Sequence, residues 1–120
     1  MYNVYFYKDK NDKEPVINYI SELSKNNDKN SKIKLKKILQ YIDYLKRFGF
    51  SLKEPYIKHL DGEIWELRPS NDRIFFIGWY NRSFVLLHCF TKKTQKTPKR
   101  EIEKAKRELD DMIERRLFDD

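Results

Sequence analysis

The sequence predicts a compact α+β domain with the element order β-α-α-β-β-β-α, in which helices pack on a small mixed or antiparallel sheet. Apolar residues recur with strand periodicity near the N-terminus and three times between residues 64 and 90, and with helical periodicity in three other segments. The 120 residues are 39% hydrophobic and 15% aromatic, which suffices for one core and is too apolar for disorder. No repeat or Pro/Gly/Ser-rich linker divides them, so residues 1–120 are expected to form one domain.

The first strand and first helix are expected within the first 26 residues. Aromatic and β-branched side chains crowd residues 2–7 and favour a strand, which the charged, turn-forming residues 8–13 end. Apolar residues then recur at helical spacing from Pro15, a residue that a first helical turn tolerates. This helix is expected to end near Asn26.

The second helix is expected between the possible N-caps in residues 26–31 and Gly49, a suitable residue beyond a helix C-terminus. A stripe at i, i+3, i+4 and i+7 spacing marks its buried face: Leu35, Ile38, Leu39, Ile42 and Leu45. The opposite face carries Lys32, Lys36, Lys37 and Lys46. That face is an ordinary solvent face unless a ligand lies there.

Three consecutive strands are expected to form an antiparallel meander. The Asp61-Gly62 turn signal precedes a strand at residues 64–68, and turns at 69–72 and 81–82 separate it from strands at 73–80 and 84–90. In the last strand, a period of two puts four side chains on one face: Phe84, Leu86, His88 and Phe90. The crossover through the helical pair is long enough for the first strand to pair in parallel.

An amphipathic helix is expected to close the domain. Thr97 would be its N-cap and Pro98 its first residue. Its apolar face contains Ile102, Ala105, Leu109, Met112 and Ile113.

The composition narrows the class of protein. A single cysteine, Cys89, excludes an internal disulfide and favours the reducing cytoplasm, and the N-terminus lacks the apolar segment of a signal peptide. No apolar run is long enough to predict a membrane span. The net charge of +7 favours an acidic partner such as nucleic acid. Eight basic and two acidic residues fall in each of two blocks, 32–58 and 91–107, which are either solvated helix faces or a surface that a polyanion bridges.

Common catalytic motifs are absent from the sequence. His59, His88 and Cys89 are the only His and Cys residues, too few to predict a zinc site, so no metal and no cofactor is expected. Three glycines cannot build a Gly-rich phosphate loop. His88 and Cys89 are adjacent on a strand and therefore face apart, which disfavours a Cys-His nucleophile.

A cluster of cations is expected at one end of the meander. Arg68 and Arg73 flank one turn, and Lys92, Lys93 and Lys96 leave the last strand at the same sheet edge. Such a cluster suits a phosphate ligand, because like charges repel unless an anion offsets them.

Each of these residues also has a structural interpretation. Arg68 could pair with Glu66 on its own strand face, and Arg73 could flank the turn beside Asp72. The lysines could belong to a solvated loop. His88 could be a hydrogen-bonded, half-buried side chain rather than a proton donor or phosphate contact.

The second half of the chain is similar to a known family. Residues 60–110 include the motifs E-L-R and L-L-H-C-F-T-K-K-T-Q-K-T-P and the helix that follows them. With these motifs the segment resembles the RelE/ParE toxin superfamily, and specifically its phage-derived HigB-like branch. The resemblance implies a RelE-like fold and the toxin of a type II toxin-antitoxin system. Such a toxin is typically a metal-independent mRNA endoribonuclease that acts on the ribosome and inhibits translation in the cytoplasm.

The resemblance also implies partners. A HigA-like helix-turn-helix antitoxin would neutralise the toxin, mRNA on the ribosome would be the substrate, and operator DNA would be bound only through the complex with the antitoxin. Two alternatives remain: a non-catalytic, ParE-like inhibitor of DNA gyrase, and a plain nucleic-acid-binding module.

Finally, the resemblance implies roles for individual residues. Arg73 matches a phosphate-binding, transition-state position, Lys92 or Lys93 matches a basic residue after the last strand, and Arg68 is the Arg of E-L-R. With His88 we expect Arg73, Lys92 and Lys93 to be catalytic, and we expect four residues to bind RNA or phosphate: Arg68, Lys96, Lys36 and Lys37. The chain lacks a clear counterpart of the C-terminal tyrosine that some members use as general base, so the base could be Tyr80, His88 or a lysine of lowered pKa.

Overall fold

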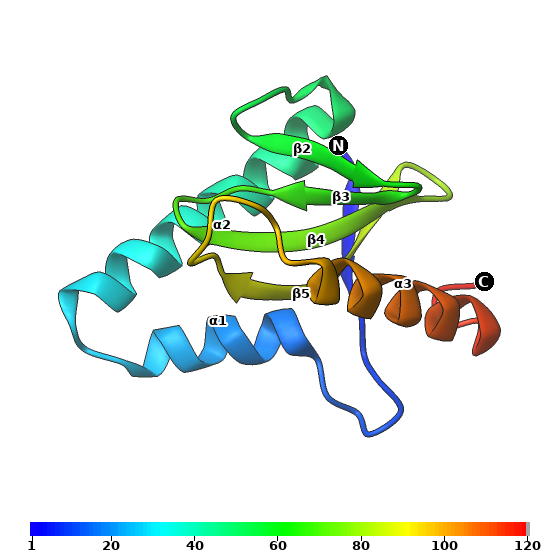
Figure 1. Cartoon of the computed structure of the whole chain (residues 1–120), viewed down its shortest axis with the longest axis horizontal. Coiled ribbons are helices and arrows are strands. Elements are labelled where there is room, and N and C mark those ends of the chain that lie inside the picture. The colour runs from blue at the N-terminus through cyan, green and yellow to red at the C-terminus, as the bar shows by residue number, and fades with distance from the viewer. Residues whose placement is uncertain (120) are drawn as a thin grey trace.

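A computed structural model describes residues 1–119 as a five-stranded mixed sheet with helices on both faces (Figure 1). The elements are β1 (Asn3–Phe6), α1 (Pro15–Lys25), α2 (Lys29–Phe48), the 3-10 turn η1 (Gly49–Ser51), β2 (Ile57–Asp61), β3 (Ile64–Leu67), β4 (Asp72–Trp79), β5 (Ser83–Thr91) and α3 (Lys99–Glu114). The sheet order is β1-β5-β4-β3-β2. The α+β prediction is confirmed, including the parallel pairing of the first strand, here with β5.

Strand β2 was not predicted as a separate strand. It pairs antiparallel with β3 and forms an edge of the sheet. Its residues Lys58 and His59 are both exposed, so β2 shows no clear alternation of buried and exposed side chains. A pattern of period two could not reveal such an edge strand.

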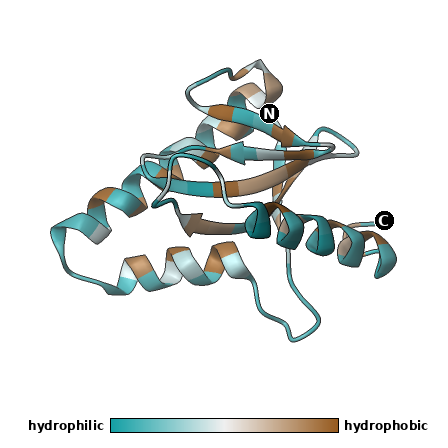
Figure 2. Ribbon diagram, viewed as in Figure 1, coloured by the Kyte–Doolittle hydropathy of each residue, from teal (hydrophilic) through white to brown (hydrophobic). Residues whose placement is uncertain are grey.

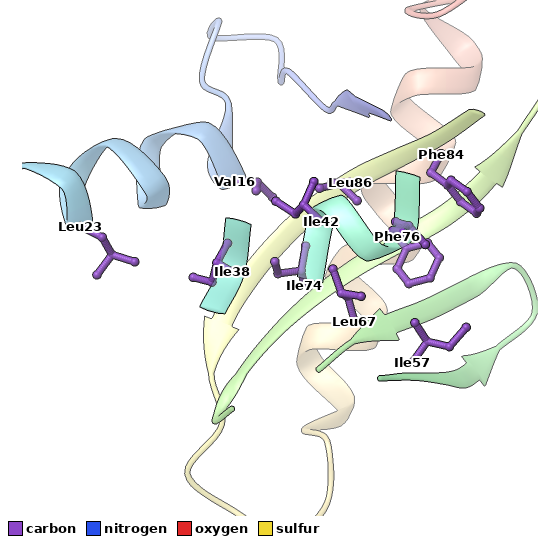
Figure 3. Close-up of a cluster of buried hydrophobic side chains, with 11 residues drawn as sticks. Val16, Leu23, Ile38, Ile42, Ile57, Leu67, Ile74, Phe76, Phe84 and Leu86 are labelled. Atoms are coloured by element: carbon purple, nitrogen blue, oxygen red, sulfur yellow. The ribbon is translucent and has the colours of Figure 1, made fainter. Parts of the chain in front are cut away.

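The sheet separates two apolar clusters. Helices α1 and α2 pack on one face, where Val16, Ile38 and Ile42 meet Ile74 and other strand residues (Figure 3). Helix α3 packs on the other face. Figure 2 shows apolar residues concentrated along β4 and β5 and alternating with polar residues along the helices. Within the described chain, no helix is both long and apolar enough to cross a membrane.

The ends of α2 follow the predicted signals. The Asp28 carboxylate caps the helix by accepting a hydrogen bond from the backbone N–H of Ser31 at 3.0 Å. Gly49 at the other end has a φ of +54°, and a Cβ there would lie 2.6 Å from the Tyr2 ring. Only glycine combines this conformation with this contact.

The predicted N-cap of α3 is wrong. Pro98 occupies the cap position and α3 begins at Lys99. The hydroxyl of Thr97 donates instead to Oε1 of Glu66 at 3.1 Å. The segment before α3 is thereby fixed to β3.

A β-bulge changes the predicted face of β5. Phe75 pairs with His88 but Phe76 pairs with Leu86, so Leu87 is an extra residue in the ladder. Phe84 and Leu86 therefore pack towards α1 and α2, whereas His88 and Phe90 lie on the α3 side of the sheet. The expectation that these four side chains share one face is wrong, because the bulge shifts the alternation by one residue.

Candidate functional site

One end of the sheet gathers four positively charged residues. There β3 ends, β4 begins and β5 ends, as their antiparallel pairing requires (Figure 1). Arg68 follows β3, Arg73 is the second residue of β4, and Lys92 follows β5. Lys58 on β2 lies opposite Glu66 on β3. We call Lys58, Arg68, Arg73 and Lys92 the cationic rim.

The buried carboxylate of Glu66 lies among these cations. The residue Glu66 is 1% exposed, and its Oε2 is 3.4 Å from Nε of Arg68 and 3.8 Å from Nε of Arg73. The Glu66–Arg68 pair, which was one of the two interpretations of Arg68, is therefore present. The buried Asp72 carboxylate also acts on Arg73, but it is paired with a fifth cation, Lys34. Two carboxylates cannot balance five cations, so this sheet end keeps an excess of positive charge.

Arg73 is held in a fixed orientation. Its side chain is 10% exposed, and one terminal nitrogen donates to the carbonyl oxygens of Ser70 and Asp72, each at 2.8 Å. Burial lowers the pKa of Arg73, and the charge of Glu66 opposes this shift. Among the described residues, the buried Nε atoms of Arg68 and Arg73 have no hydrogen-bond acceptor.

Lys92 lies close to the other members of the rim. Its backbone N–H donates to the carbonyl of Asn71 at 2.7 Å. Burial lowers the pKa of the Lys92 ammonium, and the positive charge of Arg73 lowers it further. Glu66 acts in the opposite direction. Lys92 is therefore a lysine of lowered pKa at the sheet end.

Lys93 and Lys96 lie in a loop that is attached to this sheet end at both sides. The loop begins after the contact of Lys92 with Asn71 and ends at Thr97, which is bound to Glu66. Both lysines are exposed. The structure thus keeps them beside the rim without packing them into it.

Lys36 and Lys37 are exposed on α2, the helix that packs on the opposite face of the sheet from α3. Sequence reasoning missed a nearer lysine of α2, Lys34. Its Nζ lies 3.4 Å from Asp72 and 3.3 Å from the Thr91 hydroxyl, at the sheet end where the rim lies. Only the packing of α2 on the sheet places Lys34 there, and no sequence spacing gives that information.

His88 does not reach the cationic rim. It is 1% exposed, and its Nδ1 lies 2.5 Å from Glu108 and its Nε2 3.0 Å from Glu101, both on α3. A direct contact of His88 with a bound phosphate would need these buried contacts to break. In the structure His88 joins β5 to α3, and its expected catalytic role stays a prediction that these contacts disfavour.

Tyr80 also lies away from the rim. It occupies the turn after β4, whereas the rim lies at the start of β4. Six residues of β4, 74–79, lie between Arg73 and Tyr80, which places their backbones about 23 Å apart. Tyr80 thus cannot act on a phosphate bound at the rim.

Within residues 1–119, no group of three His, Cys, Asp or Glu residues is placed to hold a metal ion.

Comparison with known proteins supports the similarity noted in the sequence. Residues 18–110 match the family described as phage derived protein Gp49-like. The chain belongs to this Gp49-like family. The match contains the whole cationic rim, Glu66 and the loop with Lys93 and Lys96. No curated protein matches the chain.

The Gp49-like chain also shares its fold with a solved structure. It is similar to a chain of the archaeal RelE-RelB complex from Pyrococcus horikoshii OT3, with 16% identity and a TM-score of 0.51. The similarity covers 76% of this chain and 94% of the archaeal one. The RelE-like fold expected from the sequence is therefore confirmed.

Proposed function

We propose that this Gp49-like chain is the toxin of a type II toxin-antitoxin pair, a HigB-like, metal-independent endoribonuclease that cleaves mRNA on the ribosome in the cytoplasm. The observation that carries the proposal is the convergence of Arg68, Arg73 and Lys92 around one carboxylate. The RelE-like fold and the family support it. The excess positive charge suits a substrate made of phosphates.

The proposed reaction is attack of a ribose 2′-hydroxyl on the adjacent phosphate. The hydroxyl gives its proton to a general base, a 2′,3′-cyclic phosphate forms, and the 5′-oxygen of the next nucleotide leaves and takes up a proton. The pentacoordinate phosphate gains negative charge in the transition state, and fixed cations stabilise it. Arg68 and Lys92, which are more exposed than Arg73, would contact the phosphate oxygens. Arg73, bound to two backbone carbonyls, would add a fixed charge beneath them.

Lys92 is our candidate for proton transfer. Its pKa is lowered by burial and by Arg73, which favours the neutral amine that a general base requires. The other two candidates for the general base are less suitable, because His88 is buried and Tyr80 lies beyond the far end of β4. Lys93, Lys96, Lys36 and Lys37 would guide the RNA towards the rim by their charge.

Mapping of transcript ends tests the activity. We expect expression of the wild type to create new 5′ ends within mRNAs, and Lys92→Ala and Arg68→Ala to abolish them. Lys106→Ala is a matched control, because Lys106 pairs with Asp61 at the other end of β2. An absence of new ends in cells whose growth the wild type stops would contradict the proposal.

A supercoiling assay separates the main alternative, a ParE-like inhibitor of DNA gyrase. Gyrase inhibition without RNA cleavage would favour that function. A third function, plain binding of nucleic acid, would give salt-dependent affinity and no cleavage product.

The proposed partner is a HigA-like helix-turn-helix antitoxin, and the fold similarity to a RelE-RelB complex supports such a partner. Operator DNA would be bound only through that complex. Co-expression of this chain with the product of a short neighbouring reading frame tests it. We expect the two chains to copurify and the growth arrest to disappear.

A further inference from the structure

Three tyrosines from two separate segments pack together at the end of the sheet that carries the cationic rim, on the face that α2 covers. Tyr41 and Tyr44 lie on α2, and Tyr56 directly precedes β2. The Tyr56 ring centroid lies 5.5 Å from that of Tyr41 and 5.8 Å from that of Tyr44, and the Tyr41 and Tyr44 centroids are 5.6 Å apart. Each ring is therefore supported by the other two.

This cluster is open to solvent. Tyr56 is 39% exposed, while Tyr41 and Tyr44 are half-buried beneath it. Burial raises the pKa of Tyr41, and the nearby hydroxyls of Tyr56 and Tyr44 raise it further. Within residues 1–119, no hydrogen bond occupies any of the three hydroxyls. The cluster thus presents a rigid aromatic surface with free polar groups.

Positively charged residues lie near the cluster. The carbonyl of Tyr56 accepts a hydrogen bond from the backbone N–H of Arg68 at 2.9 Å, so the backbone of Tyr56 adjoins that of a member of the rim. Nζ of Lys37 is 5.8 Å from the centroid of the Tyr41 ring. All three tyrosines belong to the block 32–58, in which eight residues are basic and two acidic.

Packing alone does not account for this composition. Aliphatic side chains could also pack residues 53–56 against α2, but only an aromatic side chain leaves a flat ring face at the surface. Aromatic rings beside a track of cations are the usual means of binding single-stranded nucleic acid, since bases stack on the rings while cations hold the phosphates.

We propose that Tyr41, Tyr44 and Tyr56 form a stacking platform for an unpaired base of the RNA whose phosphate lies at the cationic rim. The inference rests on the proposed function and deepens it by specifying a single-stranded substrate. Tyr56 contacts the base, and Tyr41 and Tyr44 hold its ring in place. The platform tolerates different bases, because every base offers a flat face.

Affinity measurements on the full chain test the platform. The probe is a short single-stranded RNA with 2′-O-methyl riboses, which removes the attacking hydroxyl and prevents cleavage. We expect Tyr56→Leu to weaken binding about tenfold and Tyr56→Phe to bind as the wild type does. The salt dependence should stay unchanged in Tyr56→Leu, whereas Lys92→Ala should reduce it.

Abasic probes separate stacking from an indirect effect on Arg68. The series consists of probes that each lack a different base. For one of these probes, the wild type should lose as much affinity as Tyr56→Leu loses for the complete RNA. Tyr56→Leu should then lose nothing further on that probe. Equal losses of Tyr56→Leu on complete and abasic RNA would overturn the platform, as would a loss confined to binding of the antitoxin.

The two proposals fail in different ways. If Tyr56→Leu binds RNA normally while Lys92→Ala does not, the platform is wrong and the ribonuclease proposal stands. If the wild type neither binds nor cleaves RNA, both are wrong. Thermal unfolding of Tyr56→Leu and Tyr56→Phe controls for loss of structure.

Discussion

Nδ1 of His88 lies 2.5 Å from Oε1 of Glu108, and this contact joins the last strand of the sheet to the last helix inside the protein. The imidazole also contacts Glu101 through Nε2 at 3.0 Å. Both His88 and Glu108 are buried. Removal of the imidazole would therefore leave the Glu108 carboxylate in the interior without this partner, which is costly.

We expect His88→Ala to lower the free energy of unfolding by about 3 kcal/mol, measured by urea denaturation. Glu108→Ala should cost much less in the His88→Ala background than alone, since the pair is already broken. His59→Ala is the control: His59 is exposed, and its loss should cost at most about 1 kcal/mol. Additive effects of the His88 and Glu108 substitutions would contradict the coupling.

Local patterns were sufficient to predict most of the fold. The helical stripe before Gly49, the caps near Asp28 and the apolar runs of β4 and β5 each act within a few residues, so the sequence reveals them. The convergence of Arg68, Arg73 and Lys92 also followed from strand direction alone. Neighbouring antiparallel strands bring a known pair of ends together whatever their side chains are.

Features that depend on long-range packing could not be predicted. The bulge at Leu87 depends on the partner strand, and it decides that His88 faces α3. Thr97 was expected to cap α3, but Glu66 across the sheet end binds its hydroxyl. Lys34 reaches Asp72 only because α2 packs on its face of the sheet. In each case the decisive partner is distant in the sequence.

Cys89 should make the free energy of unfolding depend on pH in the alkaline range. Burial raises the pKa of its thiol to about 12, and the nearby Asp72 carboxylate acts in the same direction. The buried neutral thiol therefore contributes its full stabilisation at pH values below the pKa of an unfolded thiol, about 8.5. This contribution is lost as the pH rises towards the pKa of the folded protein, about 12. We expect the difference in free energy of unfolding between the wild type and Cys89→Ala, measured by urea denaturation, to fall as the pH rises from about 8 to about 11. Rapid alkylation of the native thiol at neutral pH would contradict this.

Substitutions of Arg73 and Lys92 should both reduce RNA cleavage but should differ in their effect on the free energy of unfolding. Arg73→Ala removes the donor to the carbonyls of Ser70 and Asp72 and should lower the free energy of unfolding by about 2 kcal/mol. Lys92→Ala removes a side chain with no ion pair in the described part of the chain and should change stability by less than about 0.5 kcal/mol. Both should reduce RNA cleavage by about a hundredfold. A stable Arg73→Ala, or an active Lys92→Ala, would contradict these roles.

Glu66→Gln should reveal what the Glu66 carboxylate contributes to the rim. Its Oε1 could still accept the hydrogen bond from Thr97, but the negative charge between Arg68 and Arg73 would be lost. We expect the free energy of unfolding to fall by about 1–3 kcal/mol and added inorganic phosphate to restore part of it, in urea denaturation with and without phosphate. Glu66→Asp keeps the charge and serves as the control.

The same substitution tests Lys92 as the general base. Glu66 raises the pKa of Lys92 and so opposes the effects of burial and of Arg73. In Glu66→Gln the Lys92 pKa should fall further, and a larger fraction of the amine should be neutral at a given pH. The acidic limb of the rate of RNA cleavage against pH should therefore shift to lower pH than in the wild type. A shift to higher pH, or none, would mean that another group accepts the proton from the attacking 2′-hydroxyl.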